Sequence, residues 1–480
     1  MFNARKITSF ITAAAMAVSI FTFSPVLADE QFESAADAVG RIGAGWNLGN
    51  TLDSYGTWIT AGPGNSQAYE TAWQNPVTTQ AMIDSVRDKG FNAIRIPVTW
   101  SQHIDSNGHV DQGWMNRVKE VVDMAYNDGL YVILNVHHDT GEGGGDKVSW
   151  IFADNFNYDQ NQNKFAGLWT EIANEFKEYG TRLLFEGYNE MMDTANTWEA
   201  PSNSSSYQAV NNYAQLFVNT VRATGGNNAE RNLIVNTYVS SFNQSVLDSF
   251  TVPTDSADGH LICEIHCYSP WGFTGTSQSV TWTSVHNDFG QQDKDEIDGI
   301  MSRLASFSSS RNIPLIIGEY GAEFKNNEDQ IALYVSYFVG TAGQKGIKCF
   351  YWDNGDFKTS GEGGYAIFNR SALSWKDQIA DAIVSAAAPY TSESAPEQAT
   401  PTPTPEPEET TAETSAAAET SVQTEETAQT TETVPAAPET PKEEKDSSFN
   451  LVPFITVDAV LAVAAACLVV YYLKAKKERK

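Results

Sequence analysis

The chain has 480 residues, with 30 Lys or Arg against 60 Asp or Glu and a formal net charge of −30 at pH 7. This acidic balance excludes nucleic acid as an expected partner, because binding to phosphates depends on Lys and Arg side chains. Four cysteines do not make a disulfide framework, so we expect a large hydrophobic core to stabilise the folded part.

The first 28 residues have the features of a secretory signal peptide. Arg5 and Lys6 precede an apolar stretch from Ile11 to Phe23, and Val26–Ala28 supplies a small-residue cleavage site. We therefore exclude residues 1–28 from the fold. The protein is expected to be exported.

Eight short apolar runs recur between residues 29 and 390, with helical stretches between them. The runs are Gly43–Leu48, Ala93–Pro97, Tyr131–Val136, Arg182–Gly187, Asn232–Asn236, His260–Ile265, Pro314–Gly318 and Lys348–Trp352. This alternation of apolar runs and helical stretches indicates parallel strands with crossover helices. Eight strands in about 360 residues predict an α/β fold, the closed (β/α)8 TIM barrel.

An open, doubly wound sheet is the competing fold. It would be expected to carry a glycine-rich phosphate loop after its first strand, but Gly43–Gly49 lacks the G-x-G-x-x-G spacing. In a barrel, the polar residues that follow the strands converge on one face, and we expect the chemistry there.

Two glutamates at strand ends, Glu190 and Glu319, are the candidate catalytic residues. Hydrolysis of a sugar acetal needs one carboxylic acid to protonate the leaving oxygen and a second carboxylate at the anomeric carbon. A lone Glu after an apolar run is usually a solvated strand end. Here the interpretation as a catalytic pair rests on the polar and aromatic residues that end the other runs.

Arg95 and the pair His137 and His138 are the next candidates. An Arg inside an apolar strand needs a carboxylate partner, for which we expect Glu319. The alternative for Arg95 is a purely structural ion pair. Adjacent residues on a strand point to opposite faces and no H-E-x-x-H element is present, so hydrogen bonds to sugar hydroxyls are expected here rather than a metal site.

The remaining candidates are Asn189, His266, Tyr268 and Trp352. His266 and Tyr268 share one face of the sixth strand, and Trp352 offers an apolar plate for the C–H face of a pyranose. As isolated residues, Tyr268 and Trp352 would be interpreted as core aromatics. Further tryptophans fall in predicted loops and are candidates for binding additional sugar rings: Trp58, Trp73, Trp100, Trp150, Trp198, Trp271 and Trp282.

The sixth run also carries Cys263 and Cys267. Their spacing puts them about 13 Å apart at about 3.3 Å per residue, too far for a disulfide.

Beyond residue 390 the composition changes twice. Residues 391–448 are rich in Thr, Pro, Glu, Ala and Ser without an aromatic residue, which predicts a disordered, extended linker. Residues 449–473 form an apolar segment long enough for a single transmembrane helix, with Asp458 expected at the interface. Residues 474–480 form a basic tail that should stay cytoplasmic.

A cell-wall sorting signal would need a Leu-Pro-x-Thr-Gly sequence before the apolar segment, and none is present. We therefore expect the C-terminal helix to be retained as a membrane anchor, with the catalytic domain on the outside of a bacterial cell.

Residues of about 35–390 resemble glycoside hydrolase family five, the cellulase A type. The resemblance lies in stretches that occur in order and at roughly regular spacing: Gly45–Asn50, Ile94–Pro97, His137-His138, Asn189-Glu190, His266–Tyr268, Gly318–Gly321 and Trp352. It implies a retaining, two-step hydrolysis with Glu190 as general acid/base and Glu319 as nucleophile.

The resemblance also implies substrate-binding roles. Arg95 and Tyr268 would contact the nucleophile, and Asn189 would bind the 2-hydroxyl of the sugar being cleaved, a hydrogen bond that strengthens in the transition state. The same subsite would be completed by His137, His266 and Trp352, with His138 and Asn47 as lesser candidates. This chemistry needs neither a cofactor nor a metal.

These observations predict a monomeric endo-β-1,4-glucanase, a cellulase, acting on cellulose or related β-glucans. A mannanase, xylanase or xyloglucanase on the same barrel is the alternative among enzymes. The alternative from a different class is a non-catalytic glycan-binding surface protein.

Overall fold

The computed structural model describes residues 32–392, except residues 63, 199, 202, 278 and 358–363. The predicted signal peptide (1–28), the linker from residue 393, the transmembrane helix (449–473) and the basic tail (474–480) lie outside the described residues. Among the residues that are described, no helix has both the length and the apolar character needed to cross a membrane.

Eight parallel strands form a closed barrel in the described part of the chain, in the order β1 to β8. The strands are β1 (Ala44–Leu48), β2 (Ala93–Ile96), β3 (Tyr131–Asn135), β4 (Leu183–Glu186), β5 (Leu233–Asn236), β6 (Leu261–His266), β7 (Leu315–Tyr320) and β8 (Lys348–Asp353). Pairing of β1 with β8 closes the sheet, so no strand edge is left open. The predicted (β/α)8 barrel is confirmed. Each predicted run overlaps one of its strands, although β6 and β8 end one residue later than predicted and β7 ends two residues later.

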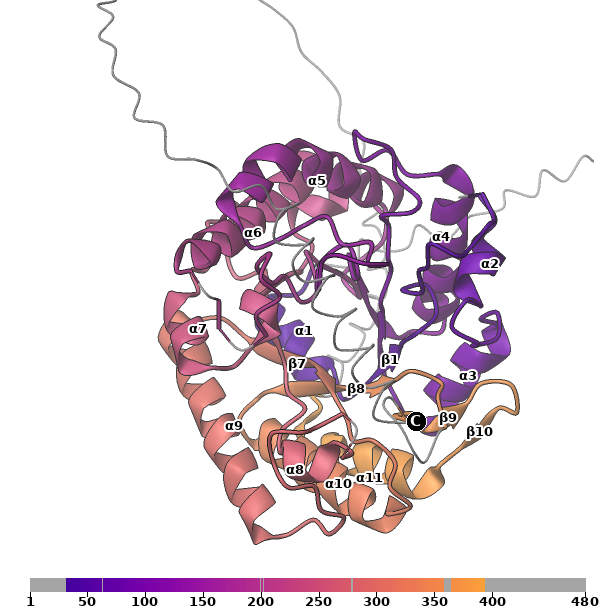
Figure 1. Ribbon diagram of the computed structural model, residues 1–480, viewed down its shortest axis with the longest axis vertical. Coiled ribbons are helices and arrows are strands. Elements are labelled where there is room, and N and C mark those ends of the chain that lie inside the picture. The colour runs from indigo at the N-terminus through magenta and orange to yellow at the C-terminus, as the bar shows by residue number, and fades with distance from the viewer. Residues whose placement is uncertain are drawn as a thin grey trace, which may run out of the picture. The chain divides into compact units, whose positions relative to one another are not determined.

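Helices form a ring around the strands (Figure 1). They are α1 (Ala35–Arg41), α2 (Ser66–Glu70), α3 (Gln80–Lys89), α4 (Gln112–Asn127), α5 (Asn155–Glu175), α6 (Ser205–Ala223), α7 (Gln244–Ser249), α8 (Trp271–Thr274), α9 (Gln291–Arg311), α10 (Glu328–Gln344) and α11 (Asp377–Ala387). Asp111 and Asp154 begin α4 and α5 by accepting a hydrogen bond from a backbone N–H in the first turn, as preferred N-cap residues do.

Short elements complete the described chain. The 3-10 helices are η1 (Gly226–Ala229), η2 (Tyr238–Ser240) and η3 (Ala388–Tyr390). An antiparallel pair, β9 (Phe368–Asn369) and β10 (Ser374–Trp375), follows β8.

The inside of the barrel is apolar at the N-terminal ends of the strands. A compact cluster there joins the inward side chains of the strands to α1, which crosses that end and closes it. Its members are Ala35, Ala38, Val39, Ile42, Ala93, Tyr131, Ile133, Leu184, Ile234, Ile262, Ile316 and Phe350. A second and larger core lies between the strands and the helical ring.

One pleat further along the strands, the inside of the barrel becomes polar. The inward side chains at this level are fully buried: Asn47, Arg95, Asn135, Glu186, Asn236 and Glu264. Side chains alternate between the two faces of a strand, so these residues lie directly above the apolar layer. They form the floor on which the residues at the strand ends rest.

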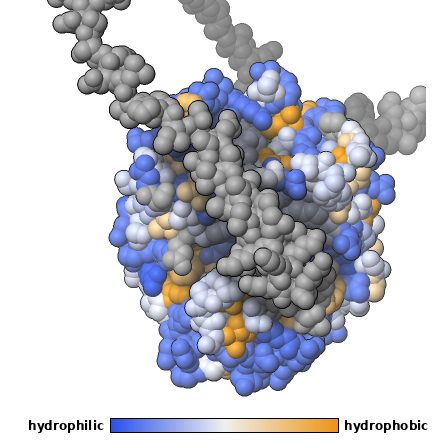
Figure 2. Space-filling view, viewed as in Figure 1, coloured by the Kyte–Doolittle hydropathy of each residue, from blue (hydrophilic) through white to orange (hydrophobic). Residues whose placement is uncertain are grey.

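The surface of the described residues in the view of Figure 2 is mostly hydrophilic, with small hydrophobic patches. This agrees with the acidic composition. Inside, Cys263, Cys267 and Cys349 are buried and free.

Candidate active site

Arg95 of β2 organises the centre of the barrel. Its Nε and Nη2 donate to the two carboxylate oxygens of Glu186 at 2.6 and 2.8 Å. Its Nη1 donates to Glu319 Oε1 at 2.8 Å and to Asn47 Oδ1 at 3.0 Å, and Nη2 also donates to Asn189 Oδ1 at 2.8 Å. The predicted partner Glu319 is therefore found, together with a second carboxylate partner.

Glu319 lies near the end of β7 and is held from two sides. Arg95 donates to Oε1, and the Tyr268 hydroxyl donates to Oε2 at 2.8 Å. Burial, followed by the negative charge of Glu319, raises the pKa of Tyr268 well above its ordinary value, so the phenol remains a donor. The carboxylate is thereby fixed in orientation while 7% of its side chain stays exposed.

Glu190 follows β4 and is more open to solvent, with 20% of its side chain exposed. Its Oε1 contacts Nδ1 of His266 at 2.7 Å. Burial raises the pKa of the Glu190 carboxyl, although the His266 hydrogen bond acts in the opposite direction. A raised carboxyl pKa favours the protonated form that a general acid needs at neutral pH.

The two candidate catalytic carboxylates face each other. An oxygen of Glu190 and an oxygen of Glu319 lie within 4.8 Å. Retaining glycosidases place the two carboxyl groups about 5–5.5 Å apart, and inverting enzymes leave about 6.5–9.5 Å for a water molecule. The arrangement fits direct nucleophilic attack on the sugar rather than attack by an intervening water.

His137 and Trp352 form one wall beside these carboxylates. Their rings are nearly parallel, at an interplanar angle of 8° and a centroid distance of 5.9 Å. Burial lowers the pKa of His137 well below its ordinary value, so the ring is neutral and has both a donor and an acceptor for sugar hydroxyls. The structure therefore brings all eight predicted site residues to the C-terminal face of the barrel.

Two three-residue groups among the described residues place His nitrogens and carboxylate oxygens within 4.8 Å of one another: Asp53, His137 and His138, and Glu190, His266 and Glu319. In the first group the Asp53 oxygens already accept backbone N–H groups of Asn50 and Thr51. Burial also raises the pKa of Asp53 to about 7, which weakens it as a ligand. Neither group is assigned as a metal centre.

Comparison with known proteins gives a consistent result. Residues 52–358 match the Cellulase family (glycosyl hydrolase family 5). Endoglucanase A of Ruminococcus albus is 39% identical over 358 residues, which cover 73% of this chain and 92% of that protein. The chain belongs to glycosyl hydrolase family 5.

Other relatives differ in how much of their length is matched. Endoglucanase A of Clostridium longisporum is 37% identical, and the chain spans 65% of its length. A crystal structure of a family 5 enzyme from Prevotella bryantii B14 with a xyloglucan tetradecasaccharide is 40% identical, with a TM-score of 0.66 over 74% of this chain and 99% of that one. A broad-specificity endoglucanase from Ruminococcus champanellensis with bound cellotriose has a TM-score of 0.68 at 37% identity, over 74% of this chain and 100% of that one.

The polar floor beneath this family 5 site was missed by sequence reasoning. Glu186 and Glu264 are both fully buried and both face Arg95, at 2.6 and 3.5 Å from its Nε. Asn135 donates to Glu186 at 3.1 Å. A signal existed, because each of these residues points inward from a strand that carries a predicted site residue or is followed by one within four residues.

The predicted loop tryptophans differ in exposure, and Trp73, Trp150 and Trp271 are partly buried. Trp100 lies in a loop as predicted, but it is fully buried and donates to the carbonyl of Asn135, so this candidate is not available to stack on a sugar ring. Trp58, Trp198 and Trp282 are 60%, 49% and 66% exposed. Their rings are therefore open to contact with a ligand.

Trp282 continues an aromatic series that begins at the candidate active site. Its ring packs edge-on against Trp271 at 5.8 Å, and Trp271 lies at 5.8 Å from Tyr268, the residue that donates to Glu319.

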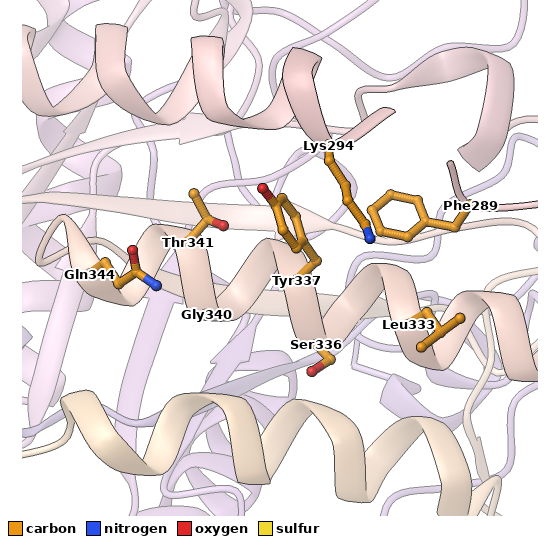
Figure 3. A pocket seen from close by; sticks show the side chains of 8 residues that line it. All are labelled: Phe289, Lys294, Leu333, Ser336, Tyr337, Gly340, Thr341 and Gln344. Carbon is orange, nitrogen blue, oxygen red and sulfur yellow. The ribbon is translucent and has the colours of Figure 1, made fainter. Parts of the chain in front are cut away.

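A cavity of about 350 Å³ also opens on the outside of the barrel, between α9 and α10. Figure 3 shows its lining: Phe289, Lys294, Leu333, Ser336, Tyr337, Gly340, Thr341 and Gln344. It contains none of the predicted site residues and belongs to the helical ring rather than to the strand ends.

Proposed function

We propose that this family 5 protein is a retaining endo-β-1,4-glucanase that cuts internal bonds of cellulose or related β-glucans. The observation that carries the mechanism is the approach of Glu190 and Glu319 oxygens to within 4.8 Å. The relatives described above, which are named endoglucanases, support the substrate class.

In the first step, Glu319 attacks the anomeric carbon while Glu190 gives its proton to the leaving glycosidic oxygen. The C–O bond to the leaving sugar breaks and a covalent glycosyl–Glu319 ester forms. In the second step, Glu190 removes a proton from water, whose oxygen attacks the same carbon and releases Glu319. Each residue returns to its starting protonation state.

The other site residues have positions that suit substrate binding. Arg95 holds the Asn189 amide by its oxygen, which leaves the amide N–H groups to donate to the 2-hydroxyl of the sugar. Trp352 supplies the apolar plate below that sugar, and His137 and His266 are the hydrogen-bonding groups beside it. Arg95 and Tyr268 orient the nucleophile.

Branched glucans form the second candidate substrate class. The neighbour from Prevotella bryantii was crystallised with a xyloglucan oligosaccharide, and the one from Ruminococcus champanellensis is described as having broad specificity. Mannan and xylan stay as alternatives because they differ from glucan by one hydroxyl orientation or one missing hydroxymethyl group.

We also propose a location and an oligomeric state. Residues 1–28 direct export, and residues 391–448 act as a linker. Residues 449–473 anchor the enzyme, a monomer, in the membrane of a bacterial cell. Support comes from the composition of these segments. We expect the activity of expressing cells in the membrane fraction, and we expect cleavage in the linker to release it. Activity that is soluble without cleavage contradicts the membrane anchor.

A reducing-end and viscosity assay on carboxymethylcellulose, mixed-linkage glucan, xyloglucan, mannan and xylan tests the function. A rapid fall in viscosity on glucans is expected. It should vanish in Glu319→Gln but persist in Glu171→Gln, a matched change at a partly exposed position on α5. Activity confined to mannan or xylan contradicts the substrate class. Binding without turnover supports the glycan-binding alternative.

An aryl cellobioside with an activated leaving group separates the two glutamates. Its first step needs no acid, so Glu190→Gln should still release a burst of phenol, whereas Glu319→Gln should release none. Proton NMR of the first product should show the β-anomer, which retention requires. An α-anomer as first product contradicts the two-step mechanism.

A further inference from the structure

Glu264 is a buried carboxylate that the proposed mechanism does not use. It lies on β6, is fully buried, and its Oε1 contacts both Nε2 of His266 at 3.2 Å and Nε of Arg95 at 3.5 Å. Its Oε2 has no hydrogen-bond partner among the described residues. A buried carboxylate with one unsatisfied oxygen is costly, so the contacts with Arg95 and His266 must offset its desolvation.

The neighbouring strand makes room for this side chain. A Cβ added to Gly318 of β7 would lie 1.9 Å from Glu264 Oε1, so no other residue fits there without displacing the carboxylate. The β6–β7 register also shifts here, from Ile265 opposite Ile317 to His266 opposite Glu319, which leaves Gly318 as the extra residue. Such a bulge re-aims the next side chain, here Glu319.

His266 therefore lies between carboxylates on both sides of its ring. Nδ1 is 2.7 Å from Glu190 Oε1 and 3.6 Å from Glu319 Oε2, and Nε2 faces Glu264. A neutral imidazole has one N–H and can donate to only one carboxylate. We propose that Glu264 is a positioning residue of the hydrolytic reaction, which holds His266 as a donor from both ring nitrogens and so fixes the ring against Glu190 and Glu319.

The charged groups around His266 support a cationic ring. Burial disfavours the imidazolium, but Glu319, Glu190 and Glu264 outweigh it and raise the pKa of His266 to about 10. Three other groups lie nearby. Glu186 of β4 interacts favourably with the ring, and the ring lowers the pKa of His137, which follows β3. Arg95 of β2 contacts Glu264 at 3.5 Å.

A cationic His266 has a defined effect on the reaction, which rests on the proposed function. It stabilises the ionised form of Glu190, the base of the second step, and so limits how far burial raises the pKa of Glu190. Loss of the Glu264 charge should make His266 neutral at a lower pH. Glu190 should then keep its proton to a higher pH.

The first test is the protonation of His266 in the whole protein labelled with ¹⁵N-histidine, followed by NMR across the pH range. The chain has seven His, and the His266 signals are identified by their loss in His266→Gln. In the wild type both ring nitrogens should carry protons at pH 7.5. A neutral His266 at that pH overturns the proposal without any need for a variant at Glu264.

Glu264→Gln should lower the pKa of His266 by about 1–3 units, the usual effect of one adjacent charge. Glu186→Gln is the matched control, because Glu186 is equally buried and paired with Arg95 but makes no hydrogen bond to His266. Its effect should be smaller. Equal shifts in the two variants overturn a specific role for Glu264.

The second test is the pH profile of kcat/KM on a soluble β-glucan. In Glu264→Gln the alkaline limb should move to higher pH by up to about one unit, and a fall in rate with both limbs unmoved shows a structural role only. Absence of activity in the wild type defeats the proposed function instead. The NMR result does not depend on activity, so the two failures are distinguishable.

Discussion

Arg95→Lys tests whether the guanidinium fork, rather than a positive charge alone, organises the site. Five N–H···O contacts of 2.6–3.0 Å join Arg95 to Glu186, Glu319, Asn47 and Asn189. Lysine keeps the charge but has three donors on one nitrogen, so at least two contacts are lost. At about 1.5–3 kcal/mol for each hydrogen bond to a charged group, the free energy of unfolding should fall by about 3–6 kcal/mol.

These losses convert into measurable quantities. With an unfolding entropy of about 2.1 cal/mol/K per residue and roughly 360 folded residues, the Tm should fall by about 4–8 °C. Loss of the donor to Glu319 Oε1, worth about 1.5–3 kcal/mol, should lower kcat/KM by about 10- to 150-fold if it is felt in the transition state. Calorimetry and the viscosity assay measure the two effects on the same preparation.

Arg231→Lys is the matched control for Arg95→Lys. Arg231 is also fully buried and makes five hydrogen bonds, but its acceptors are the amide oxygen of Asn228 and backbone carbonyls of residues 176, 179, 180 and 183. It should lose similar stability and keep its activity below its own Tm. If Arg95→Lys is destabilised to the same extent yet keeps activity within twofold, the proposed orientation of Glu319 by Arg95 is refuted.

Three further predictions use single substitutions. Because its pKa is raised to about 10, His266 contributes stability that is complete below about pH 6.5, its pKa in the unfolded chain, and is lost as the pH rises through about 10. In urea melts, the difference in free energy of unfolding between wild type and His266→Gln should therefore shrink between about pH 6.5 and 9.5. A difference that stays constant over this range contradicts the raised pKa. Gly318→Ala should displace Glu264 and lower the free energy of unfolding by about 1–3 kcal/mol in the same melts. An unchanged urea midpoint contradicts the close approach of Glu264 to Gly318. Trp282→Ala should raise KM for polysaccharide but not for a short aryl cellobioside, whereas Phe156→Ala, an exposed aromatic on α5, should change neither.

The parts of the fold that follow from local pattern could be predicted from the sequence. Buried parallel strands are short apolar runs, and eight of them with helices between them leave few arrangements other than a closed barrel. Glu190 and Glu319 could be found because residues at the C-terminal ends of such strands converge on one face. Arg95 could be paired with Glu319 because a buried charge needs a partner.

The details that depend on register could not be predicted. The predicted seventh run ends at Gly318, but β7 continues to Tyr320 and includes Glu319, because the extra residue at Gly318 bends the strand without ending it. Trp100 was predicted in a loop from its place after the second run. It is buried because its indole N–H reaches the carbonyl of Asn135 on the next strand.

Glu186 and Glu264 were missed for a different reason, which concerns how buried charges are interpreted. Taken alone, each carboxylate in an apolar run looks like a defect in the strand, because an isolated buried charge is unstable. The closed barrel places both one pleat above the apolar layer and within 3.5 Å of Arg95. One guanidinium then faces three carboxylates, counting Glu319, and a second cation is needed near them. His266 is placed to be that cation. The carboxylates that looked like defects in separate strands together favour the positive charge that we propose for this residue of the candidate active site.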